Sequence, residues 1–183
     1  MTTDKPILRQ TVMAKLLHQS MDERVVLEDK IMANLAKLIE ELKVKIIAFY
    51  HPVHHELDVT PLADHLAQKG IKVLLPRVNQ KDAPLVFNLW YPGDDMEEDL
   101  CHIPCSQGEE MVPEAVLCPC IGYDDKGSRL GYGEGYFDRT FEKYPDFIRI
   151  GVAQDMQKVD SIPREEHDIP MHYWVTETDI LKV

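Results

Sequence analysis

Apolar residues recur at helical spacing in the first quarter of the chain. Ser20-Met21-Asp22-Glu23 has the form of a capping box, in which Ser20 and Glu23 satisfy each other's free backbone amides. An approximately helical stripe follows, at Val26, Ile31, Leu35, Leu38, Ile39 and Leu42. The pattern predicts a helix that starts after Ser20, and a shorter one before it that contains Leu8, Val12, Leu16 and Leu17.

Short continuous apolar runs come next. Residues 46–50 and 71–75 read as buried strands, and Pro76 is expected to end the second one. Between them, Thr60-Pro61 predicts a helix start with proline at the first helical position, and Gly70 predicts its end. A strand, a helix and a strand within about 30 residues form a βαβ unit, so the two strands are expected to be parallel.

The remaining pattern extends the same class. Further strands are expected at residues 85–90, 115–118, 148–153 and 173–176, whereas the polar stretch 93–113 reads as the least ordered part, an insertion within the domain. We therefore predict an α/β fold: a single three-layer domain over residues 1–183, with a mostly parallel sheet and helices on both faces.

Charge and composition limit the partners. A formal net charge of −12 argues against nucleic acid, because a phosphate backbone needs a basic surface. The protein must gather cations locally or recruit a metal ion if its ligand carries phosphate. No apolar run reaches the length of a membrane helix and no secretory pattern opens the sequence, so we expect no membrane partner and a cytoplasmic location.

The four cysteines follow no common zinc-site spacing. Cys101 and Cys105 form C-x3-C, and Cys118 and Cys120 form C-x-C. Reduced structural thiols are the expected state, and a zinc site is the alternative.

One segment carries a candidate chemistry. Residues 124–139 follow a predicted strand and lead into a helix, and Gly131, Gly133 and Gly135 alternate within them. Backbone amides of such a loop, together with a helix N-terminus, can surround a phosphate. The segment is neither a Walker A loop nor a dinucleotide fingerprint. Arg129 and Asp138 add a cation for phosphate and a carboxylate for a metal; a tight strand-to-helix turn is the alternative interpretation.

The same segment resembles the signature of the 5-formyltetrahydrofolate cyclo-ligase family, also called methenyltetrahydrofolate synthetase. The similar stretches are Pro119-Cys120-Ile121-Gly122-Tyr123-Asp124 and Gly127-Ser128-Arg129-Leu130-Gly131-x-Gly133-x-Gly135-Tyr136-Phe137-Asp138-Arg139. Other matching motifs lie in order along nearly the whole chain: Lys5-x3-Arg9, Tyr50, Glu56-Leu57-Asp58, Pro61-Leu62, Leu75-Pro76-Arg77, Gln157, Ile162-Pro163-Arg164-Glu165-Glu166-His167-Asp168-Ile169-Pro170 and Val175-Thr176-Glu177.

The resemblance implies an ATP-dependent ligase of one-carbon metabolism. In that family, ATP phosphorylates the formyl oxygen of 5-formyltetrahydrofolate, a neighbouring folate nitrogen attacks the activated carbon, and phosphate leaves to give 5,10-methenyltetrahydrofolate. Phosphoryl transfer of this kind depends mainly on positioning and charge neutralisation. The implied partners are small molecules, ATP and a reduced folate, with Mg²⁺ as cofactor, and the implied state is a monomer or weak homodimer.

The resemblance also assigns roles to residues of this chain. Lys5, Arg9 and Arg129 would be catalytic and bind ATP. The rest of the implied ATP site is Leu130, Gly131, Tyr132, Gly133, Glu134, Gly135, Tyr136 and Phe137. The folate would contact Tyr50, Glu56, Tyr136 and Phe137. Asp138 and Asp168 would hold Mg²⁺, a hard cation that prefers carboxylate oxygens.

Three departures from the family pattern keep another interpretation open. Pro52 stands where a hydroxyl residue is common, the stretch 101–105 lacks an acidic-proline ending, and Glu134 puts a negative charge in the glycine loop. A non-catalytic relative that binds ATP or folate as a sensor or store is the alternative. A sugar-phosphate isomerase or acyltransferase on a similar scaffold is a third, but it gives no reason for Lys5, Arg9, Asp138 and Asp168 together.

Overall fold

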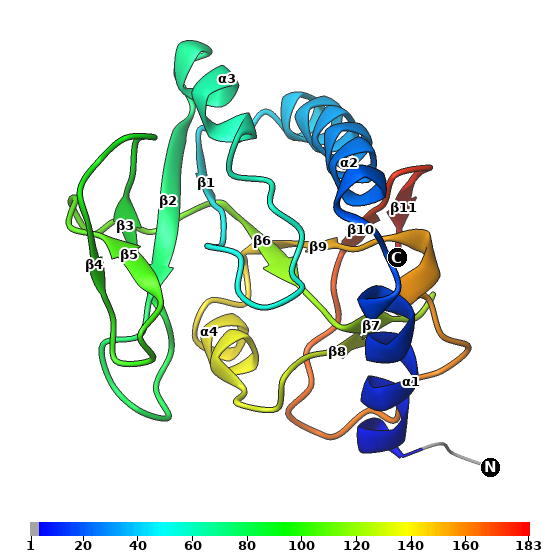
Figure 1. Cartoon of the computed structure of the whole chain (residues 1–183). Helices are drawn as coiled ribbons and strands as arrows, with labels where there is room; N and C mark the ends of the chain where they lie inside the picture. The colour runs from blue at the N-terminus through cyan, green and yellow to red at the C-terminus, as the bar shows by residue number, and fades with distance from the viewer. Residues whose placement is uncertain (1–3) are drawn as a thin grey trace.

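A computed structural model describes residues 4–183 of the chain. Its centre is a seven-stranded sheet of order β11-β10-β9-β6-β1-β2-β3 (Figure 1). Strands β2, β1, β6, β9 and β10 run parallel, and β3 and β11 pair antiparallel at the edges. The strands are β1 (Ile46–Ala48), β2 (Lys72–Arg77), β3 (Val86–Leu89), β6 (Ala115–Pro119), β9 (Ile148–Val152), β10 (Tyr173–Val175) and β11 (Ile180–Lys182).

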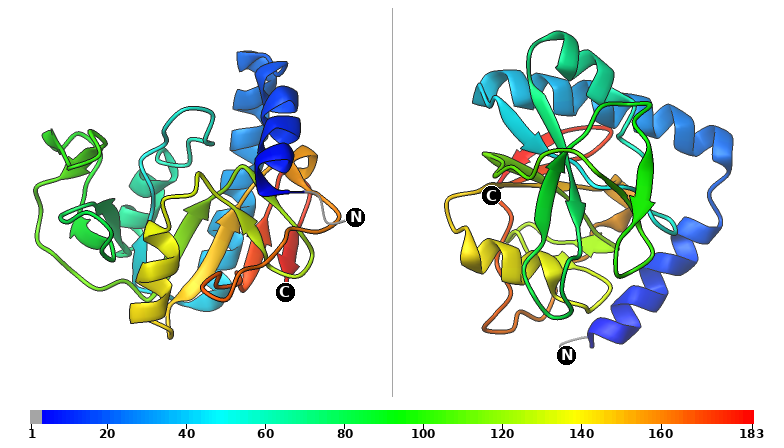
Figure 2. Two further views of the ribbon diagram at one scale, coloured as in Figure 1. Left: turned by 90° about the horizontal axis from the view of Figure 1, so that it is seen from below. Right: turned by 90° about the vertical axis from the view of Figure 1, so that its left-hand side faces the viewer.

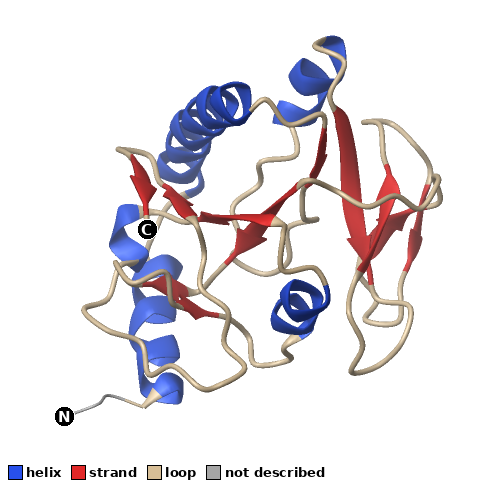
Figure 3. Cartoon of the chain, turned by 180° about the vertical axis from the view of Figure 1, so that it is seen from behind, coloured by secondary structure: helices blue, strands red, loops and turns tan. Residues whose placement is uncertain are grey.

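Helices cover both faces of this sheet, which confirms the predicted class (Figure 2). Side chains alternate along each strand, so Ile47 faces α2 (Met21–Leu42) and α3 (Leu62–Gln68), whereas Ala48 faces α4 (Tyr136–Lys143). The first helix, α1 (Lys5–Leu17), packs instead beside two short strands, β7 (Gly122–Tyr123) and β8 (Arg129–Leu130) (Figure 3).

Local signals decide where the helices begin and end. The capping box at Ser20 and Glu23 is present, as predicted. The Thr60-Pro61 prediction is off by one residue, because α3 begins at Leu62 and the Thr60 hydroxyl donates to Asp58 Oδ1 at 2.6 Å instead of capping the helix. Gly70, with φ of 76°, follows the end of α3 as expected.

Pro76 does not end β2, which continues to Arg77. The carbonyl of Leu74 accepts from the Phe49 N–H, so even-numbered residues of β2 direct their backbone groups toward β1. The register between β1 and β2 stops at Leu74. Proline two residues later therefore removes no bond of the ladder.

The stretch 93–113 is also more ordered than predicted. It contains β4 (Met96–Glu98) and β5 (Pro104–Ser106), which pair antiparallel as a separate two-stranded sheet. Between these strands, Asp99 Oδ1 accepts from the amides of Cys101 and Ile103. The turn is thus fixed by one buried carboxylate, and composition alone did not reveal it.

The connections place a switch point in the middle of the sheet. From β1 the chain passes through α3 to β2 on one side, and from β6 it passes through α4 to β9 on the other. Because β1 and β6 are neighbours, their following loops diverge to opposite faces. Ligands of open α/β sheets bind outside the carboxyl ends of strands at such a point.

Candidate active site

Two loops meet at this carboxyl edge. The loop after β1, residues 49–61, carries Tyr50 and Glu56, and the segment after β6, residues 120–135, carries Arg129 and the three glycines. The predicted site residues of both loops thus follow adjacent parallel strands.

Arg129 lies between the end of β6 and the start of α4. Its Nη1 donates to the carbonyl of Pro119 at 3.2 Å, and its Nη2 lies 3.8 Å from Asp138 Oδ2. The guanidinium also stacks on Phe137, with Cζ 5.3 Å from the ring centroid. The side chain is only 12% exposed, and Nε is buried without a partner among residues 4–183. A buried donor of this kind is available to an anion.

The three glycines of the loop suit their positions for two different reasons. A Cβ at Gly131 would lie 2.7 Å from Arg129 Nη1, so a side chain here would displace the guanidinium from its present position. Gly133 and Gly135 have φ of 99° and 71°, in the left-handed region that other residues avoid.

Helix α1 brings two more cations to the site, one of them to the glycine loop. Arg9 Nε donates to the carbonyl of Gly131 at 2.7 Å, and Lys5 Nζ lies 2.7 Å from Asp168 Oδ2. Val12 and Leu16 hold the helix in place by packing in a small apolar cluster beside β7 and β8. The basic pair predicted from the N-terminal motif therefore lies at the glycine loop and at the predicted metal residue.

The two predicted metal-binding aspartates lie in neighbouring parts of the structure. Asp138 Oδ1 accepts from the amide of Ile169 at 3.3 Å, which places it next to the Asp168 segment. Burial alone would raise the pKa of Asp168, but the Glu165 amide and the Lys5 ammonium bring it below its usual value. Within the described residues, no group of three His, Cys, Asp or Glu side chains could hold an ion by itself.

Glu56 is a buried carboxylate on the other loop. Its side chain accepts from the Val53 amide at 3.0 Å. Burial raises its pKa to about 7, although the Val53 amide and the Arg129 guanidinium act in the opposite direction. The group therefore changes charge near neutral pH, within electrostatic reach of the buried Arg129.

Two tyrosines border Glu56. Tyr50 is 2% exposed and its hydroxyl donates to the carbonyl of Leu57 at 2.7 Å, so its role beside a folate ring stays a prediction. Tyr132 is 43% exposed, with its ring 5.6 Å from that of His54 across the two loops. Burial of the hydroxyl, with the nearby Glu56, raises the pKa of Tyr132 to about 12.

The aromatic residues after the glycines begin α4. Phe137 contacts Arg129, whereas Tyr136 stacks under Arg139, whose Cζ is 4.9 Å from its ring centroid. Arg139 also donates to the backbone carbonyl of Glu134 at 2.7 Å. Glu134 itself is exposed, so the loop is built from its backbone while its carboxylate lies at the surface.

Asp124 is a site-building residue to which the sequence gave no role. It is 1% exposed; Oδ1 accepts from the amides of Lys126 and Ser128, and Oδ2 from that of Ile162. This carboxylate ties the approach to the glycine loop to the segment that carries Asp168. The sequence Asp124-Asp125-Lys126-Gly127 is typical of a turn, but it contains no signal for the bond to Ile162.

The cysteines pack rather than converge. Cys105, Cys118 and Cys120 are buried free thiols, and Cys101 is half-buried. Burial raises the pKa of Cys118 to about 12, so this thiol is neutral at physiological pH.

These features define a class before any comparison. The molecule is an α/β protein with a cation-bearing glycine loop and a buried carboxylate at the switch point of its sheet. A groove of about 580 Å³ between α2 and the β10–β11 edge contains none of these residues. No helix in the described part of the chain has the length and apolarity needed to cross a bilayer.

Comparison with known proteins gives the family. A family model of the 5-formyltetrahydrofolate cyclo-ligases matches residues 1–177. The cyclo-ligase of Escherichia coli K12 is 30% identical over 143 residues, covering 73% of this chain and 79% of the relative. That of Mycolicibacterium smegmatis is 32% identical over 143 residues, covering 72% and 73%. The solved structure of Aquifex aeolicus 5,10-methenyltetrahydrofolate synthetase is 30% identical, has a TM-score of 0.84, and is matched over 97% of this chain and 92% of its own. The chain belongs to the 5-formyltetrahydrofolate cyclo-ligase family, a family of ligases.

Proposed function

We propose that this chain uses ATP to cyclise 5-formyltetrahydrofolate to 5,10-methenyltetrahydrofolate, releasing ADP and phosphate. The observation that carries the proposal is that a cationic glycine loop and a buried carboxylate follow the adjacent strands β6 and β1 at the switch point of the sheet. Arg129 and the glycine loop offer donors to an anion, and the buried Glu56 offers a carboxylate within electrostatic reach of Arg129. The names of the relatives supply the reaction.

The proposed chemistry has two balanced steps. In the first, the formyl oxygen bonds to the γ-phosphorus of ATP while the bond to the ADP oxygen breaks. In the second, the neighbouring folate nitrogen bonds to the formyl carbon and loses its proton, and the carbon–oxygen bond breaks to release phosphate. An amide-like oxygen leaves poorly until it is phosphorylated, so the first step makes the second possible.

The residues of this chain would position and neutralise the reacting groups. Arg129 would face the transferred phosphoryl group, because its Nε is an unused buried donor. Lys5 and Arg9 would approach the triphosphate from α1, which already reaches the loop through the Arg9–Gly131 bond. Glu56 would accept a hydrogen bond from the folate, with Tyr136 and Phe137 against its ring.

The donor set of Asp138 and Asp168 fits Mg²⁺. Both side chains are mostly shielded from solvent and supply carboxylate oxygens, and Lys5 helps to keep Asp168 ionised. Mg²⁺ usually binds one or two protein carboxylates and completes its shell with waters and substrate phosphates. Bound here, it would neutralise charge on the triphosphate.

The non-catalytic alternative is not favoured. The reason to consider it was the negative charge of Glu134. This residue is exposed, and within the loop its backbone carbonyl accepts a hydrogen bond from Arg139. The proposal includes ATP and Mg²⁺ as requirements and a cytoplasmic location, with a monomer or weak homodimer as the state in solution.

One assay tests the proposal directly. Absorbance of the methenyl product should appear when the purified chain meets 5-formyltetrahydrofolate, ATP and Mg²⁺, and omission of ATP or chelation of Mg²⁺ should abolish it. Binding of ATP or folate without any turnover would overturn the proposed enzymatic activity and favour a sensor. If neither ATP nor 5-formyltetrahydrofolate binds, the assignment of this edge of the sheet as the binding site would be wrong.

A further inference from the structure

The loop that carries Glu56 has no helix or strand between residue 49 and α3. Its backbone must therefore find hydrogen-bond partners elsewhere, since buried polar groups without partners are costly. A carboxylate on such a loop is precise only if the backbone beneath it is fixed. The partners of residues 56–58 thus decide where the Glu56 side chain lies.

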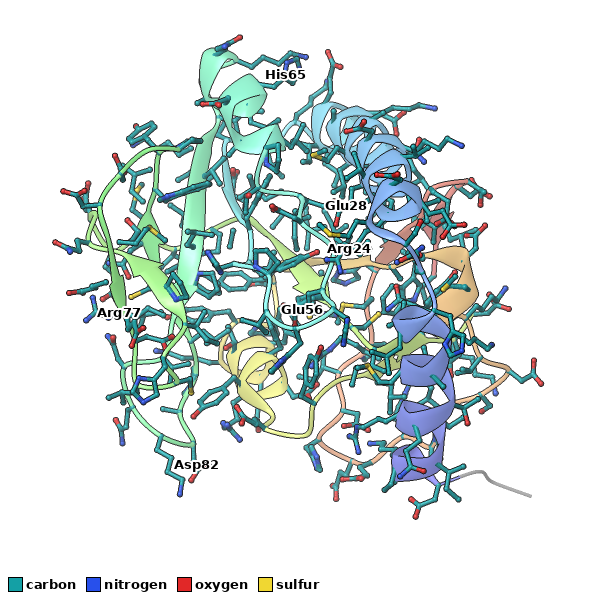
Figure 4. All side chains as sticks on the ribbon, in the orientation of Figure 1. Arg24, Glu28, Glu56, His65, Arg77 and Asp82 are labelled. Atoms are coloured by element: carbon teal, nitrogen blue, oxygen red, sulfur yellow. The ribbon has the colours of Figure 1, made fainter. Side chains whose placement is uncertain are left out.

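Two side chains of α2 supply these partners. Arg24 Nη2 donates to the backbone carbonyl of Glu56, and Glu28 Oε1 accepts from the Asp58 amide at 2.9 Å. The same Glu28 oxygen lies 2.9 Å from Arg24 Nε, so one ion pair holds the loop on both sides of Leu57. Figure 4 shows Arg24 and Glu28 on the first turns of α2, facing the segment that carries Glu56.

The pair is shielded and the loop is anchored beneath it. The Arg24 and Glu28 side chains are 27% and 13% exposed. Leu57 packs in the core at 4% exposure, and its carbonyl accepts from the Tyr50 hydroxyl. Each of the residues 56–58 thus has a backbone group bound by a specific side chain. An ion pair within one helix contributes little stability by itself. The specific effect of the Arg24–Glu28 pair is therefore to hold the backbone of residues 56–58.

We propose that Arg24 and Glu28 are positioning residues for the folate side of the site, acting through the backbone of residues 56–58 on the Glu56 carboxylate. The inference rests on the proposed function, because it assigns Glu56 to folate. It predicts that disturbing the pair affects folate and leaves ATP alone, since the glycine loop and α1 make no bond to Arg24 or Glu28 among the described residues.

The test compares Glu28→Ala with Glu28→Gln and with a control on the same helix. Glu28→Ala should raise the KM for 5-formyltetrahydrofolate about tenfold, with the ATP KM changed less than about twofold. Glu28→Gln keeps an oxygen that can accept from Asp58 and should recover most of the loss. Glu40→Ala removes a loose pair with Lys69, at 3.9 Å and mostly exposed, and should leave both KM values unchanged.

A double-mutant cycle separates positioning from general support. If Glu28 acts through Glu56, then Glu28→Ala should add less than about twofold to the folate KM in a Glu56→Gln background. Full additivity would overturn the inference, as would equal increases of both KM values. A lower melting temperature with an unchanged folate KM would also overturn it, because the pair would then be structural only.

A replacement variant and the unmutated chain separate the possible failures of this test. Where Glu28→Ala does not fold, Arg24→Lys takes its place, because lysine keeps the charge but cannot reach Glu28 and the Glu56 carbonyl together. An unmutated chain that shows no turnover would refute the proposed function and not this inference. An active chain whose folate KM ignores Arg24 and Glu28 would refute the inference alone.

Discussion

The glycine loop and the Glu56 loop both follow a central parallel strand, yet they are fixed in opposite ways. The glycine loop shapes its own backbone, through Gly133 and Gly135 at positive φ, and leaves Tyr132 and Glu134 at the surface. The Glu56 loop is packed into the core and held by side chains of α2 and by Tyr50. In the proposed site, the glycine loop would offer backbone donors to an anion, and the Glu56 loop places a single carboxylate.

The difference shows how each kind of loop answers to mutation. A loop that works through its backbone tolerates changes of its outward side chains but not of its glycines or its central cation. A loop that places one side chain depends on residues far away in the sequence. The following predictions test this contrast.

Arg129→Ala should give the largest effect. In the proposed site Arg129 would face the transferred phosphoryl group, and loss of such a donor is expected to lower kcat roughly 10²-fold or more. The chain should stay folded, because Pro119 and Asp138 are its only polar contacts among residues 4–183. Steady-state kinetics with circular dichroism measure both. Lys158→Ala, which breaks an exposed pair with Asp125, is the charge control. A near-normal kcat in Arg129→Ala would make the arginine structural.

Glu56→Gln should change how stability depends on pH. The folded carboxyl has a pKa of about 7 against an ordinary 4.5, so the folded state binds the proton more tightly. The stability that this gives is full below pH 4.5 and is lost as the pH rises through 7. The free energy of unfolding of the native chain, relative to Glu56→Gln, should therefore fall by about 3 kcal/mol between pH 4.5 and 8. Denaturant titrations at each pH measure the difference, and a flat difference would place Glu56 in water.

The same substitution should weaken folate more than ATP. Loss of a charge-assisted hydrogen bond costs about 1.5–3 kcal/mol, or roughly a 10- to 150-fold weaker folate affinity. Isothermal titration with each ligand measures the two affinities separately. Equal losses for both would remove Glu56 from the folate side.

Asp138→Asn and Asp168→Asn should each raise the Mg²⁺ concentration needed for half-maximal turnover, by about tenfold for one lost charged ligand. Folate binding measured without ATP should not change. Asp125→Asn, at an exposed surface pair, is the control. A Mg²⁺ titration that is the same in all three variants would exclude the metal role.

Glu134→Gly should have the smallest effect, less than about threefold on the ATP KM, which is under about 0.7 kcal/mol. The carboxylate is exposed, and the carbonyl that binds Arg139 is kept. A hundredfold gain in ATP affinity would show that the native loop binds ATP poorly, and would favour the non-catalytic sensor over the enzyme.

How much the sequence predicted follows the same contrast. Signals that act within a few residues were mostly interpreted correctly: the capping box at Ser20, the turn from loop to α4, and the strands predicted at 46–50 and 148–153, which end at Ala48 and Val152. The prediction that Pro76 ends β2 was wrong. The pairing of β2 with β1 stops at Leu74, so no backbone bond to β1 is lost where Pro76 lacks an N–H.

Long-range contacts account for what the sequence did not predict. The bond from Asp124 to Ile162 joins segments 38 residues apart, and that from Arg24 to Glu56 spans 32. Spacing and composition carry no record of such pairs, because they form only after the sheet has brought the elements together. The roles proposed for the site residues themselves came from the family motifs.

The attachment of α1 has a consequence for the lifetime of the assembled site. Lys5 meets Asp168 and Arg9 meets Gly131 across 163 and 122 residues, yet the helix is held by an apolar cluster separate from the two larger cores. Detachment of α1 needs this cluster and the Lys5 and Arg9 contacts to open while the two larger cores stay packed, so it costs less than global unfolding. On warming, turnover should therefore fade while the sheet is still intact. During synthesis the site cannot close until residue 168 has emerged from the ribosome, so the last of its parts to be translated sets the moment at which the enzyme can act.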